Sequence, residues 1–527
     1  MKRRTLLVGV SLIALAAAGT TAVLAPLAAD PTGAKDCGTT LPPLAAPRPR
    51  ADVVAEPNWA QRGGTINDAS CLSRTPVAGI VAVSSEADVA RALAYARAKN
   101  LPVSAAGVKH SMGGQAFRKG GVVLDMRGLD AVRLDPKNST IHVGSGATWH
   151  AIQNAIHPHF AVKAMQSTDI FTVGGSISVN AHGMDHRAGA MMDSIRSLRV
   201  MLADGRVVTA SRDDNADLFR HVIGGYGLFG IVLSAELDVV PNRIYRSERS
   251  LIGYRDFPAL FEAIDQDRAV ELTYTHLSTA PGSLLEEALV YRYRTVGDER
   301  GLVRAPLGEV SSTKLRRLTV NLAKRADWLN AVKWWSEKNL EHRLETCTVT
   351  RAQAMQDGEA CLVSRNDPMH DSVAYLANAL PKETDILHEY FVPRERLVPF
   401  IDGLREIVRG QQLKLLNASV RAVAAEDNAL SYAPRPAFSV VLYVNQPTTA
   451  EGNAAMARLT RSLIDLTIAH QGRFFLPYQL HYTPEQLQRS YPEIGAFFAA
   501  KQRWDPGGLF RNSWYDRYAP AVTSAAR

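Results

Sequence analysis

The chain has 527 residues, and at about 150 residues per domain it is expected to form two or three domains. Apolar types make up 46% of the residues and charged types 21%, which is typical of a globular protein and excludes a disordered, collagen-like or coiled-coil chain. The net charge of +8 is too dilute at this length to indicate nucleic-acid binding, so no nucleic-acid partner is expected.

The first 29 residues predict an export signal, either a cleaved signal peptide or an uncleaved signal anchor. Lys2, Arg3 and Arg4 precede an apolar stretch, and no charged residue follows until Asp30. About 20 apolar residues are enough to span a bilayer, and with the basic residues inside, the rest of the chain would lie outside the cytoplasm. We therefore expect a periplasmic or secreted protein, either free or held at the membrane by this segment. The Arg3-Arg4 pair also resembles a twin-arginine signal.

Residues 30–70 follow as a predicted proline-rich, extended linker. The four cysteines, Cys37, Cys71, Cys347 and Cys361, are too few and too scattered for a disulfide scaffold. No CxxC pair or Cys/His cluster predicts a zinc site, so no metal is expected. Up to two disulfides can form if the chain reaches an oxidising compartment.

Residues 71–245 alternate short strand and helix signals that predict an α+β unit. Ser84-Ser85-Glu86 opens a helix with its apolar positions on one face. Asp204-Gly205 is a strong hairpin signal, and Asn215 is placed to cap a helix. The strands are expected at 77–83, 101–106, 122–126, 140–143, 198–202, 206–210 and 230–240, and the helices at 84–96, 148–156 and 215–223.

Residues 246–485 carry longer elements and predict a second domain, with helices packed on one face of a sheet. Within it, residues 301–343 hold nine Lys/Arg against four Asp/Glu, together with Trp328, Trp334 and Trp335. This pattern fits a solvated helical face over a core tryptophan, or a helix that rests on anionic lipid. The strands are expected at 271–276, 288–293, 386–392 and 438–444, and the helices at 394–409 and 454–470.

Three clusters of small residues lie at strand ends of the first domain. They are AGVKHSMGGQ at 106–115, TVGGSISVNAHG at 172–183 and IGGYGLFGI at 223–231. Because glycine admits positive φ and close approach, such loops let backbone amides converge on an anion. Three clusters together suit one long diphosphate ligand. None has the GxGxxG context of a nicotinamide site or the GKS/GKT of a P-loop.

With GGVVLDM, VGSGATW, the LADG hairpin and GGYGLFGIV in the same order, the span 77–241 resembles the FAD-binding domain of the vanillyl-alcohol oxidase family, the PCMH type. The motifs are most similar to those of sugar, alditol and aldonolactone oxidases. The resemblance implies an α+β, two-domain flavoprotein that binds FAD. It also implies an FAD-binding domain at 71–245, a sheet-plus-helices substrate (cap) domain at 246–485, and a C-terminal segment, 486–527, that returns to the FAD domain.

The resemblance also implies the cofactor-binding residues. His110 sits where several family members carry a histidine bonded covalently to the flavin, and the alternative is a loop histidine hydrogen-bonded to phosphate. No cysteine lies between Cys71 and Cys347, so a second, cysteinyl bond is not expected. The expected FAD contacts are Ala106, Gly107, Val108, Lys109, His110, Ser111, Gln115, Thr172, Gly174, Gly175, Asn180, His182, Ile231 and Asn512.

The substrate half offers three candidate catalytic residues. Arg421, in NASVR, resembles the arginine that faces the substrate in aldonolactone and alditol oxidases, although that pattern has Glu where this chain has Ser419. A guanidinium near flavin N5 suits a hydroxylated substrate, because it stabilises developing alkoxide charge; a simple salt bridge of Arg421 is the alternative. His388 and Glu389 are candidates for the general base. Asn512 is expected near the flavin or as a helix cap.

These observations predict an exported FAD-dependent oxidoreductase. Its small-molecule substrate would be a sugar, polyol or lactone with a CH–OH group, hydride would pass to flavin N5, and O₂ or another electron acceptor would reoxidise the flavin. A lipid-linked sugar oxidase is one alternative, because GGSISVNAHGMDHRAG resembles the decaprenylphosphoryl-ribose oxidase group, which lacks a histidine at the position of His110. A non-catalytic flavin-binding envelope protein is the other.

Overall fold

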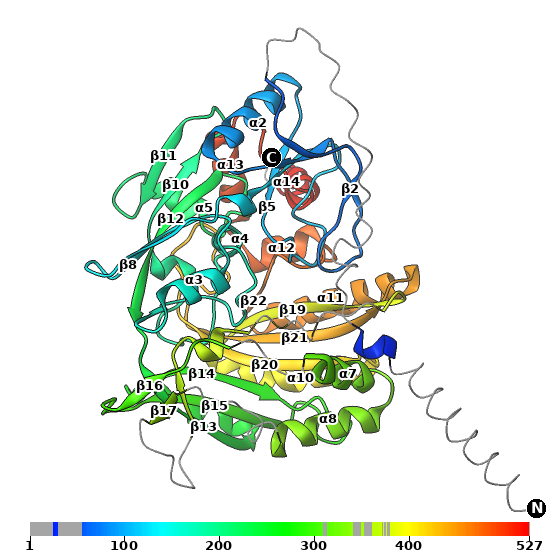
Figure 1. The fold of residues 1–527 in the computed structure, drawn as a ribbon. Helices are drawn as coiled ribbons and strands as arrows, with labels where there is room; N and C mark the ends of the chain where they lie inside the picture. Colours follow the sequence, from blue (N-terminus) through cyan, green and yellow to red (C-terminus); the bar gives the residue numbers. More distant parts are fainter. Residues whose placement is uncertain are drawn as a thin grey trace, which may run out of the picture.

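The computed structural model describes residues 25–29, 55–308, 313–340, 349–351, 361–371, 373, 376 and 380–525. The chain is a two-domain α+β protein, and Figure 1 shows one lobe above the other. The predicted export signal falls outside these ranges apart from residues 25–29, of which 25–28 form a helical turn. Residues 30–54 of the predicted linker also fall outside them.

The upper lobe begins with a four-stranded sheet in the order β1-β4-β6-β5. Strand β1 lies inside the predicted linker, and Trp59 packs edge-on against Tyr95 at 5.5 Å. The linker prediction was therefore wrong from residue 59 onward, because this segment is held by strand pairing and by the contact between Trp59 and Tyr95. The strands are β1 (Trp59–Arg62), β4 (Gly79–Ala82), β6 (Val122–Asp125) and β5 (Val103–Ala106), and a separate pair is formed by β2 (Thr65–Ile66) and β3 (Thr75–Pro76).

Helix α2 (Glu86–Ala98) begins where its sequence signal predicts. The Ser85 hydroxyl accepts a hydrogen bond from the Asp88 amide at 3.2 Å, which satisfies one of the free donors of the first turn. Val89 and Leu93 are fully buried on one face of the helix and belong to the same apolar cluster as Val81 of β4. The helix thus covers the four-stranded sheet.

The second sheet of the upper lobe has the order β11-β10-β12-β8-β7, with β9 paired to β12. The β10–β11 hairpin at Asp204-Gly205 is confirmed, and Gly205 supplies the positive φ of 93°. The strands are β7 (Val132–Asp135), β8 (Thr140–Gly144), β9 (Phe160–Val162), β10 (Ile195–Met201), β11 (Val207–Ser211) and β12 (Ile231–Pro241), and the helices are α3 (Trp149–Ile156), α4 (Val173–Val179) and α5 (Ala216–Val222).

The lower lobe is built on one eight-stranded sheet in the order β18-β13-β15-β14-β20-β21-β19-β22. Helices cover one face, where Phe261 of α6 packs on Phe438 at 5.0 Å and Phe400 of α10 packs on Tyr390 at 6.2 Å. Because side chains alternate along a strand, Glu389 and Ser439 point to the other face. The sheet strands are β13 (Ile244–Gly253), β14 (Val270–Leu277), β15 (Glu287–Thr295), β18 (Leu362–Ser364), β19 (Glu383–Pro393), β20 (Leu415–Val423), β21 (Ala437–Pro447) and β22 (Arg473–Phe474).

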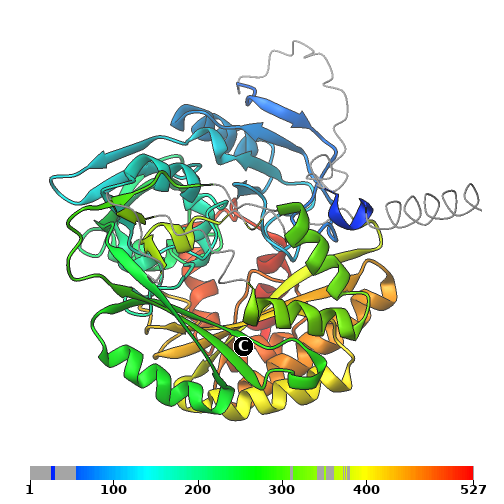
Figure 2. The same ribbon diagram turned by 60° about the horizontal axis from the view of Figure 1, so that its bottom comes forward.

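The helices of this lobe form two groups. Helices α6, α10 and α11 pack along the sheet, and α7 and α8 lie together beside it, as Figure 2 shows from below. Their bounds are α6 (Phe257–Gln266), α7 (Thr313–Ala323), α8 (Asp327–Asn339), α10 (Leu397–Gly410) and α11 (Ala450–Ala469), and a separate strand pair is formed by β16 (Leu302–Arg304) and β17 (Val349–Arg351).

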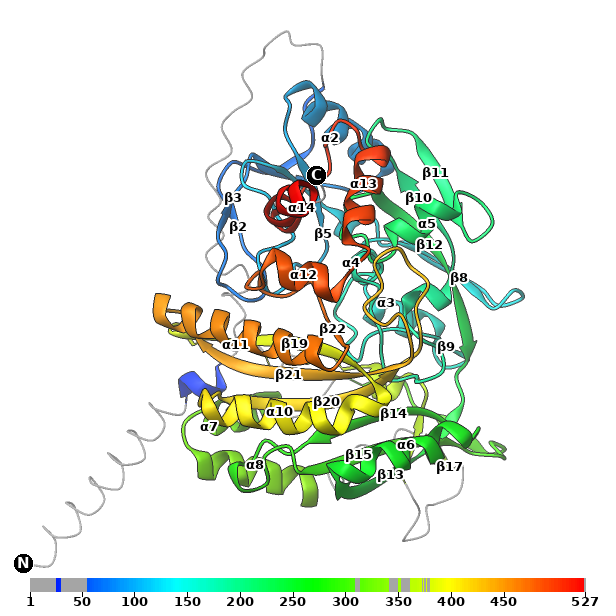
Figure 3. The same ribbon diagram turned by 180° about the vertical axis from the view of Figure 1, so that it is seen from behind.

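The closing segment carries helices α12 (Pro484–Ser490), α13 (Ile494–Trp504) and α14 (Ser513–Ala525). Figure 3 shows α13 and α14 in the upper lobe, beside elements formed by the start of the chain. The Val103 amide donates to the Leu509 carbonyl at 2.7 Å, and the Arg511 amide donates to the Val103 carbonyl at 3.0 Å. Residues near the end of the chain therefore pair with β5.

Two further features concern the cysteines and the helices of the described residues. Cys71 and Cys361 are both disulfide-bonded. Among the helices that the structure describes, none is both long and apolar enough to cross a bilayer.

Candidate active site

The loop 106–115 after β5 presents free backbone donors. The amide N–H groups of Gly107, Val108 and Ser111 donate to no protein group in the described ranges. The position of the loop is fixed by a hydrogen bond from the Ala69 amide, which lies 3.0 Å from the Lys109 carbonyl and 3.1 Å from the Ser111 carbonyl. Lys109 adopts a positive φ of 58°. A fixed loop with unused amides is suited to bind a phosphate.

His110 is a neutral imidazole. Burial lowers its pKa to about 4, and its ring packs edge-on against Phe171 at 4.8 Å. Its Nδ1 atom is buried without a hydrogen-bond partner among the residues that the structure describes. A neutral ring with a free nitrogen is the form that can attack an electrophilic carbon, such as the flavin methyl group.

The loop 167–175 packs directly on the first loop. A Cβ atom added to Gly107 would lie 2.0 Å from Thr172 Oγ1, and one added to Gly174 would lie 2.9 Å from Ser145 Cβ. The buried hydroxyls of Ser145, Ser167 and Thr168 have no hydrogen-bond partner in the described part of the chain. Buried polar atoms without partners indicate a missing ligand. Gly107, Thr172, Gly174 and Gly175 thus lie together, as predicted for the cofactor site.

Some amides of the other two glycine clusters donate within the protein. The Gly174 amide donates to the Ser145 carbonyl at 2.8 Å, the Gly224 amide to the Ile177 carbonyl at 2.9 Å and the Tyr226 amide to the Ser178 carbonyl at 2.9 Å. The amides of Gly175 and Gly227 have no acceptor among the described residues, so binding of a diphosphate by all three clusters stays a prediction. In the second and third clusters the small residues allow backbone segments to approach each other.

Three predicted cofactor residues have other contacts. Asn180 binds the Glu426 carboxylate with Nδ2 and accepts the Met192 amide at Oδ1, 3.0 Å away. Asn512 donates to the Tyr226 carbonyl and accepts the Tyr515 amide, both at 2.9 Å, so its side chain caps α14. The Ile231 side chain is buried in the apolar cluster of α2 and β4. The side chains of these three residues therefore contact other protein groups in the structure.

A buried carboxylate forms the centre of the substrate-side cluster. Glu389 Oε1 lies 2.5 Å from His182 Nε2 and accepts the Ser439 hydroxyl at 2.6 Å, while Oε2 accepts the Tyr478 hydroxyl at 3.3 Å. Burial favours the neutral carboxyl, but the hydrogen bonds and charges of His182, Ser439 and Arg421 outweigh it and lower the pKa of Glu389. Glu389 is thus an ionised carboxylate at neutral pH.

Arg421 shares this face of the sheet. Arg421 pairs with Ser439 across β20 and β21, and Glu389 pairs with Val441 across β19 and β21. Ser439 and Val441 are two residues apart on β21, so Arg421 and Glu389 point to the same face of the sheet. Among the described residues the Arg421 side chain makes no ion pair or hydrogen bond, so the salt-bridge alternative was wrong. Burial lowers the pKa of Arg421, and the nearby Glu389 and Tyr478 oppose this effect. An unpaired, half-buried guanidinium beside a carboxylate is suited to a polar ligand.

The cluster lies against the FAD loop. A Cβ atom added to Gly113 would lie 2.2 Å from the Tyr478 carbonyl oxygen. Gln115 Nε2 donates to the Pro477 carbonyl at 2.7 Å. Tyr478, which binds Glu389, is therefore held next to the loop that offers free amides. His182, which was predicted to contact the cofactor, also belongs to this cluster through its contact with Glu389.

His388 does not join Glu389, although the two are adjacent in sequence. They alternate along β19, so their side chains point to opposite faces. His388 Nδ1 lies 2.9 Å from the Tyr390 hydroxyl, on the helix-covered face. Burial and the nearby His481 lower the pKa of His388 to about 3. The prediction that His388 acts as general base was wrong for this geometric reason.

Glu426 is a half-buried acid that the sequence analysis missed. It accepts hydrogen bonds from Asn180 Nδ2 at 2.5 Å, the Ser431 hydroxyl at 3.0 Å and the Ala433 amide at 2.9 Å. Burial raises its pKa to about 7, although these hydrogen bonds oppose the shift. Its partner Asn180 lies 246 residues away, so no local pattern could have identified it.

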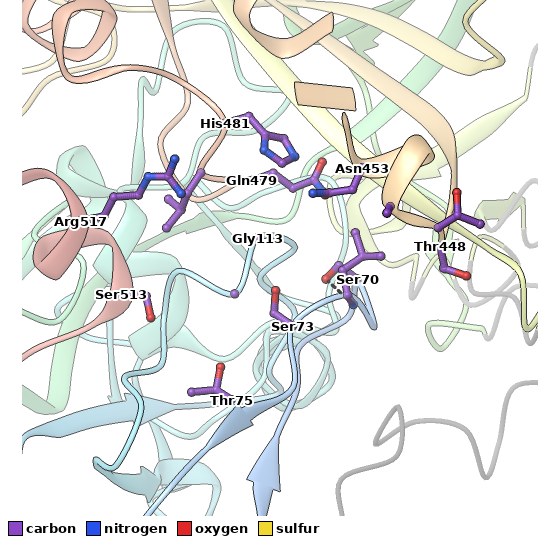
Figure 4. Close-up of a pocket in the computed structure, with 15 residues that line it drawn as sticks. Ser70, Ser73, Thr75, Gly113, Thr448, Asn453, Gln479, His481, Ser513 and Arg517 are labelled. Atoms are coloured by element: carbon purple, nitrogen blue, oxygen red, sulfur yellow. Dashed lines mark hydrogen bonds between the residues drawn. The ribbon is translucent and has the colours of Figure 1, made fainter. Parts of the chain in front are cut away.

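A polar cavity of about 710 Å³ borders the FAD loop at Gly113 and Gly114. Figure 4 shows Gln479 and His481 on one side of it and Ser73 and Arg517 on others. Gln479 follows Tyr478 in the chain, so the cavity adjoins the segment that contacts Glu389. Its hydroxyl, amide and guanidinium lining is suited to hydroxylated or anionic molecules.

Comparison with known proteins supports the cofactor directly. Residues 77–211 match the FAD binding domain family, and residues 310–518 match the D-arabinono-1,4-lactone oxidase family. The first match contains His110 and Thr172, and the second contains Glu389 and Arg421. This chain is an FAD-dependent oxidoreductase. The free amides, unpaired hydroxyls and neutral His110 fit FAD, which supplies hydride-accepting chemistry when bound.

Individual relatives of the flavoenzyme include several redox enzymes. Decaprenylphosphoryl-beta-D-ribose oxidase of Mycolicibacterium smegmatis is 24% identical over 458 residues, 82% of this chain and 93% of that protein. Cytokinin dehydrogenase 2 of Arabidopsis thaliana is 31% identical over 199 residues, 37% of this chain and 39% of that protein. FAD-linked oxidoreductase fogF of Aspergillus ruber is 33% identical over 162 residues, 30% of this chain and 32% of that protein. The last two matches cover less than half of each relative.

Proposed function

We propose that the flavoenzyme oxidises a CH–OH group of a sugar, polyol or lactone-like molecule. The observation that carries this proposal is the pairing of an ionised carboxylate, Glu389, with an unpaired guanidinium, Arg421, on one sheet face beside the FAD loop. When bound, FAD supplies the hydride acceptor at N5 and is reoxidised by O₂ or another acceptor.

In this proposal the two charged residues act on the substrate hydroxyl. Arg421 contacts the hydroxyl oxygen and stabilises the negative charge that develops on it. Glu389 accepts the hydroxyl proton as the C–H bond breaks, and His182, 2.5 Å away, holds the carboxylate in place. Tyr478 fixes the second carboxylate oxygen. The product is the corresponding carbonyl compound.

The test is anaerobic mixing of the purified holoenzyme with sugars, polyols and lactones while visible flavin absorbance is followed. Bleaching by at least one hydroxylated compound is expected, and readmission of oxygen then separates an oxidase from a dehydrogenase. A flavin that is bleached by dithionite but by none of these compounds would contradict the proposed substrate class. A colourless, correctly folded protein would contradict FAD binding itself.

We infer a second candidate, a lipid-linked sugar substrate presented at a membrane surface. The similarity to a decaprenylphosphoryl-beta-D-ribose oxidase, which covers 82% of this chain, supports it. So does an apolar surface on α7 and α8, formed by Leu315, Trp328, Val332 and Trp335, whose exposed fractions are 52–66%. Trp328, Val332 and Trp335 recur at helical spacing, as on helices that rest on lipid.

The position of this surface also supports the membrane proposal. Asn321 of α7 donates a hydrogen bond to the Leu27 carbonyl at 2.7 Å, and Leu27 is buried. The predicted apolar signal segment therefore joins the folded protein at α7, and Figure 2 shows this turn next to α7 and α8. An anchor that leaves the protein here would bring Trp328 and Trp335 to the bilayer surface.

Vesicles containing brominated lipids test this candidate, since bromine quenches nearby tryptophan. The tryptophan fluorescence of the full chain should be quenched, and this quenching should fall strongly in the W328F/W335F variant. The control variant W59F, which changes a tryptophan of β1 in the other domain, should be quenched as strongly as the wild type. Equal quenching in wild type and W328F/W335F would place these residues away from lipid. Oxidation of a polyprenyl-linked sugar, but not of the free sugar, would favour this candidate over the first.

We further propose that the protein acts outside the cytoplasm, in the periplasm or as a secreted protein. The disulfide-bonded state of Cys71 and Cys361 supports this, because disulfides persist in oxidising compartments. Fractionation of the native host tests it: the protein should be accessible to protease added to spheroplasts. Recovery only after lysis would contradict export.

A further inference from the structure

We propose that His150, Asp169 and His370 bind a divalent transition-metal ion, with Zn²⁺ as the probe. One candidate ligand atom from each residue lies within 4.8 Å of the other two. His150 Nδ1 lies 2.8 Å and His370 Nδ1 lies 3.1 Å from the same Asp169 oxygen, Oδ2. Two imidazoles and one carboxylate are a ligand set that zinc and related ions take.

The burial of Asp169 is an independent reason to expect a cation. Its side chain is 1% exposed, and its other oxygen, Oδ1, accepts no hydrogen bond in the part of the chain that the structure describes. Within the same part, no Lys or Arg forms an ion pair with it, and the basic side chains nearest to it are the two imidazoles. A buried carboxylate with an unsatisfied oxygen is costly, and a bound cation would satisfy it.

Three separate segments hold the ligands in place. The His150 amide donates to the Asp169 carbonyl at 2.9 Å, and the Asp169 amide donates to the Asp371 carbonyl at 3.2 Å. Gln153 Oε1 lies 3.0 Å from His370 Nδ1 and accepts a hydrogen bond when that nitrogen carries the proton, which leaves Nε2 as the ring nitrogen for an ion. Such outer contacts orient metal-binding histidines. The His150 side chain is 35% exposed, which leaves a coordination position open to water.

The site would join the two domains. His150 lies on α3 and Asp169 in the loop before α4, both in the FAD-binding domain, whereas His370 follows β18 of the substrate domain. Asp169 is two residues from Phe171, which packs on His110. An ion here would therefore fix the loop that carries Phe171 and Thr172 against the substrate domain. Because His370 lies about 200 residues from the other two ligands in sequence, spacing alone could not predict the site.

Metal content and thermal unfolding of the FAD-loaded protein test the proposal. After treatment with EDTA and addition of Zn²⁺, the wild type should retain one ion per chain through desalting, and its Tm should rise. H150Q/H370Q and D169N should lower Zn²⁺ affinity by more than about 100-fold, and Q153L by about tenfold. The control H159Q, at an exposed histidine outside the cluster, should match wild type.

Flavin absorbance shows that each variant is folded, independently of enzyme activity. Equal Zn²⁺ retention in H150Q/H370Q and wild type, or no saturable binding by wild type, would overturn the site. If H150Q/H370Q and D169N fail to retain FAD, the proposal is tested by Zn²⁺ titrations of Q153L and wild type instead. Gln153 would act on the ion only through His370, so its replacement leaves all three ligands in place. Loss of substrate turnover alone does not bear on the metal.

Discussion

At the scale of single residues, Glu389 should determine the chemical step. Replacing it with Gln keeps its shape but removes the proton acceptor, so we expect flavin reduction by substrate to slow by about 10²–10⁴-fold. The pKa of Glu389 lies below its ordinary value, so wild-type reduction should persist in mild acid and fall only below the ordinary range near pH 4.3. Stopped-flow reduction rates against pH measure both effects.

The control for Glu389 is Glu395→Gln, the same change at an exposed position. It should leave the reduction rate and its pH profile unchanged. If Glu389→Gln reduces its flavin as fast as wild type, another group accepts the proton. His388 would not be that group, because it faces the helices on the other side of the sheet.

His110 should determine how the flavin is held. Wild type is expected to keep flavin fluorescence on a denaturing gel, because a neutral His110 can form a covalent bond to it. His110→Ala should release all of its flavin on acid precipitation, and His159→Ala should behave as wild type. A wild-type band without fluorescence would favour the phosphate-binding role of His110.

At the scale of elements, the FAD site depends on close packing of two loops. Gly107→Ala places a methyl group 2.0 Å from Thr172 Oγ1, so FAD occupancy and Tm should fall. Thr172→Ala removes that atom, and the double variant should recover part of the loss, with a coupling of about 1 kcal/mol. Gly282→Ala, where the added atom meets nothing within 4 Å, is the control.

Thermal unfolding of the four proteins measures this cycle. If the effects of Gly107→Ala and Thr172→Ala on Tm are strictly additive, the two residues are not coupled, and the proposed close packing of the two loops would be contradicted. FAD content after desalting should follow the same order as Tm, since the loops hold the cofactor between them.

Sequence alone predicts the elements well where the signal is local. The cap of α2 at Ser85 and the Asp204-Gly205 hairpin form as expected, because capping and turn chemistry act over a few residues. The FAD loop at 106–115 was also found, since glycines and polar residues mark it. The side-chain partners in the site were harder to predict. Glu426 and Asn180, or Glu389 and His182, meet only through the packing of two domains.

At the scale of the whole molecule, Glu426 couples the two lobes through Asn180 and should make stability depend on pH. Its folded pKa of about 7 lies above that of an unfolded glutamate, so the folded state binds the extra proton between these values. Stability from this group is therefore lost as pH rises from about 5 to 7, by at most about 3 kcal/mol. Glu426→Gln cannot ionise and should reduce this dependence.

Denaturant unfolding at pH 5, 6, 7 and 8 (about one pH unit apart across the window) measures the difference between Glu426→Gln and wild type. As pH rises, the free energy of unfolding of Glu426→Gln should increase relative to that of the wild type, whichever of the two is more stable at pH 5. A constant difference across this range would show that Glu426 keeps the same charge in both states. Glu395→Gln again serves as an exposed control.

The pairing of β5 with residues 509–511 has a consequence for biosynthesis. The strand that leads into the FAD loop takes its neighbour from a segment that follows the entire substrate domain in sequence. During synthesis, β5 therefore lacks this neighbour until the substrate domain has been translated. A polypeptide interrupted within that domain would be released with its nucleotide-binding lobe incomplete, and we expect it to carry no coenzyme and to be open to degradation.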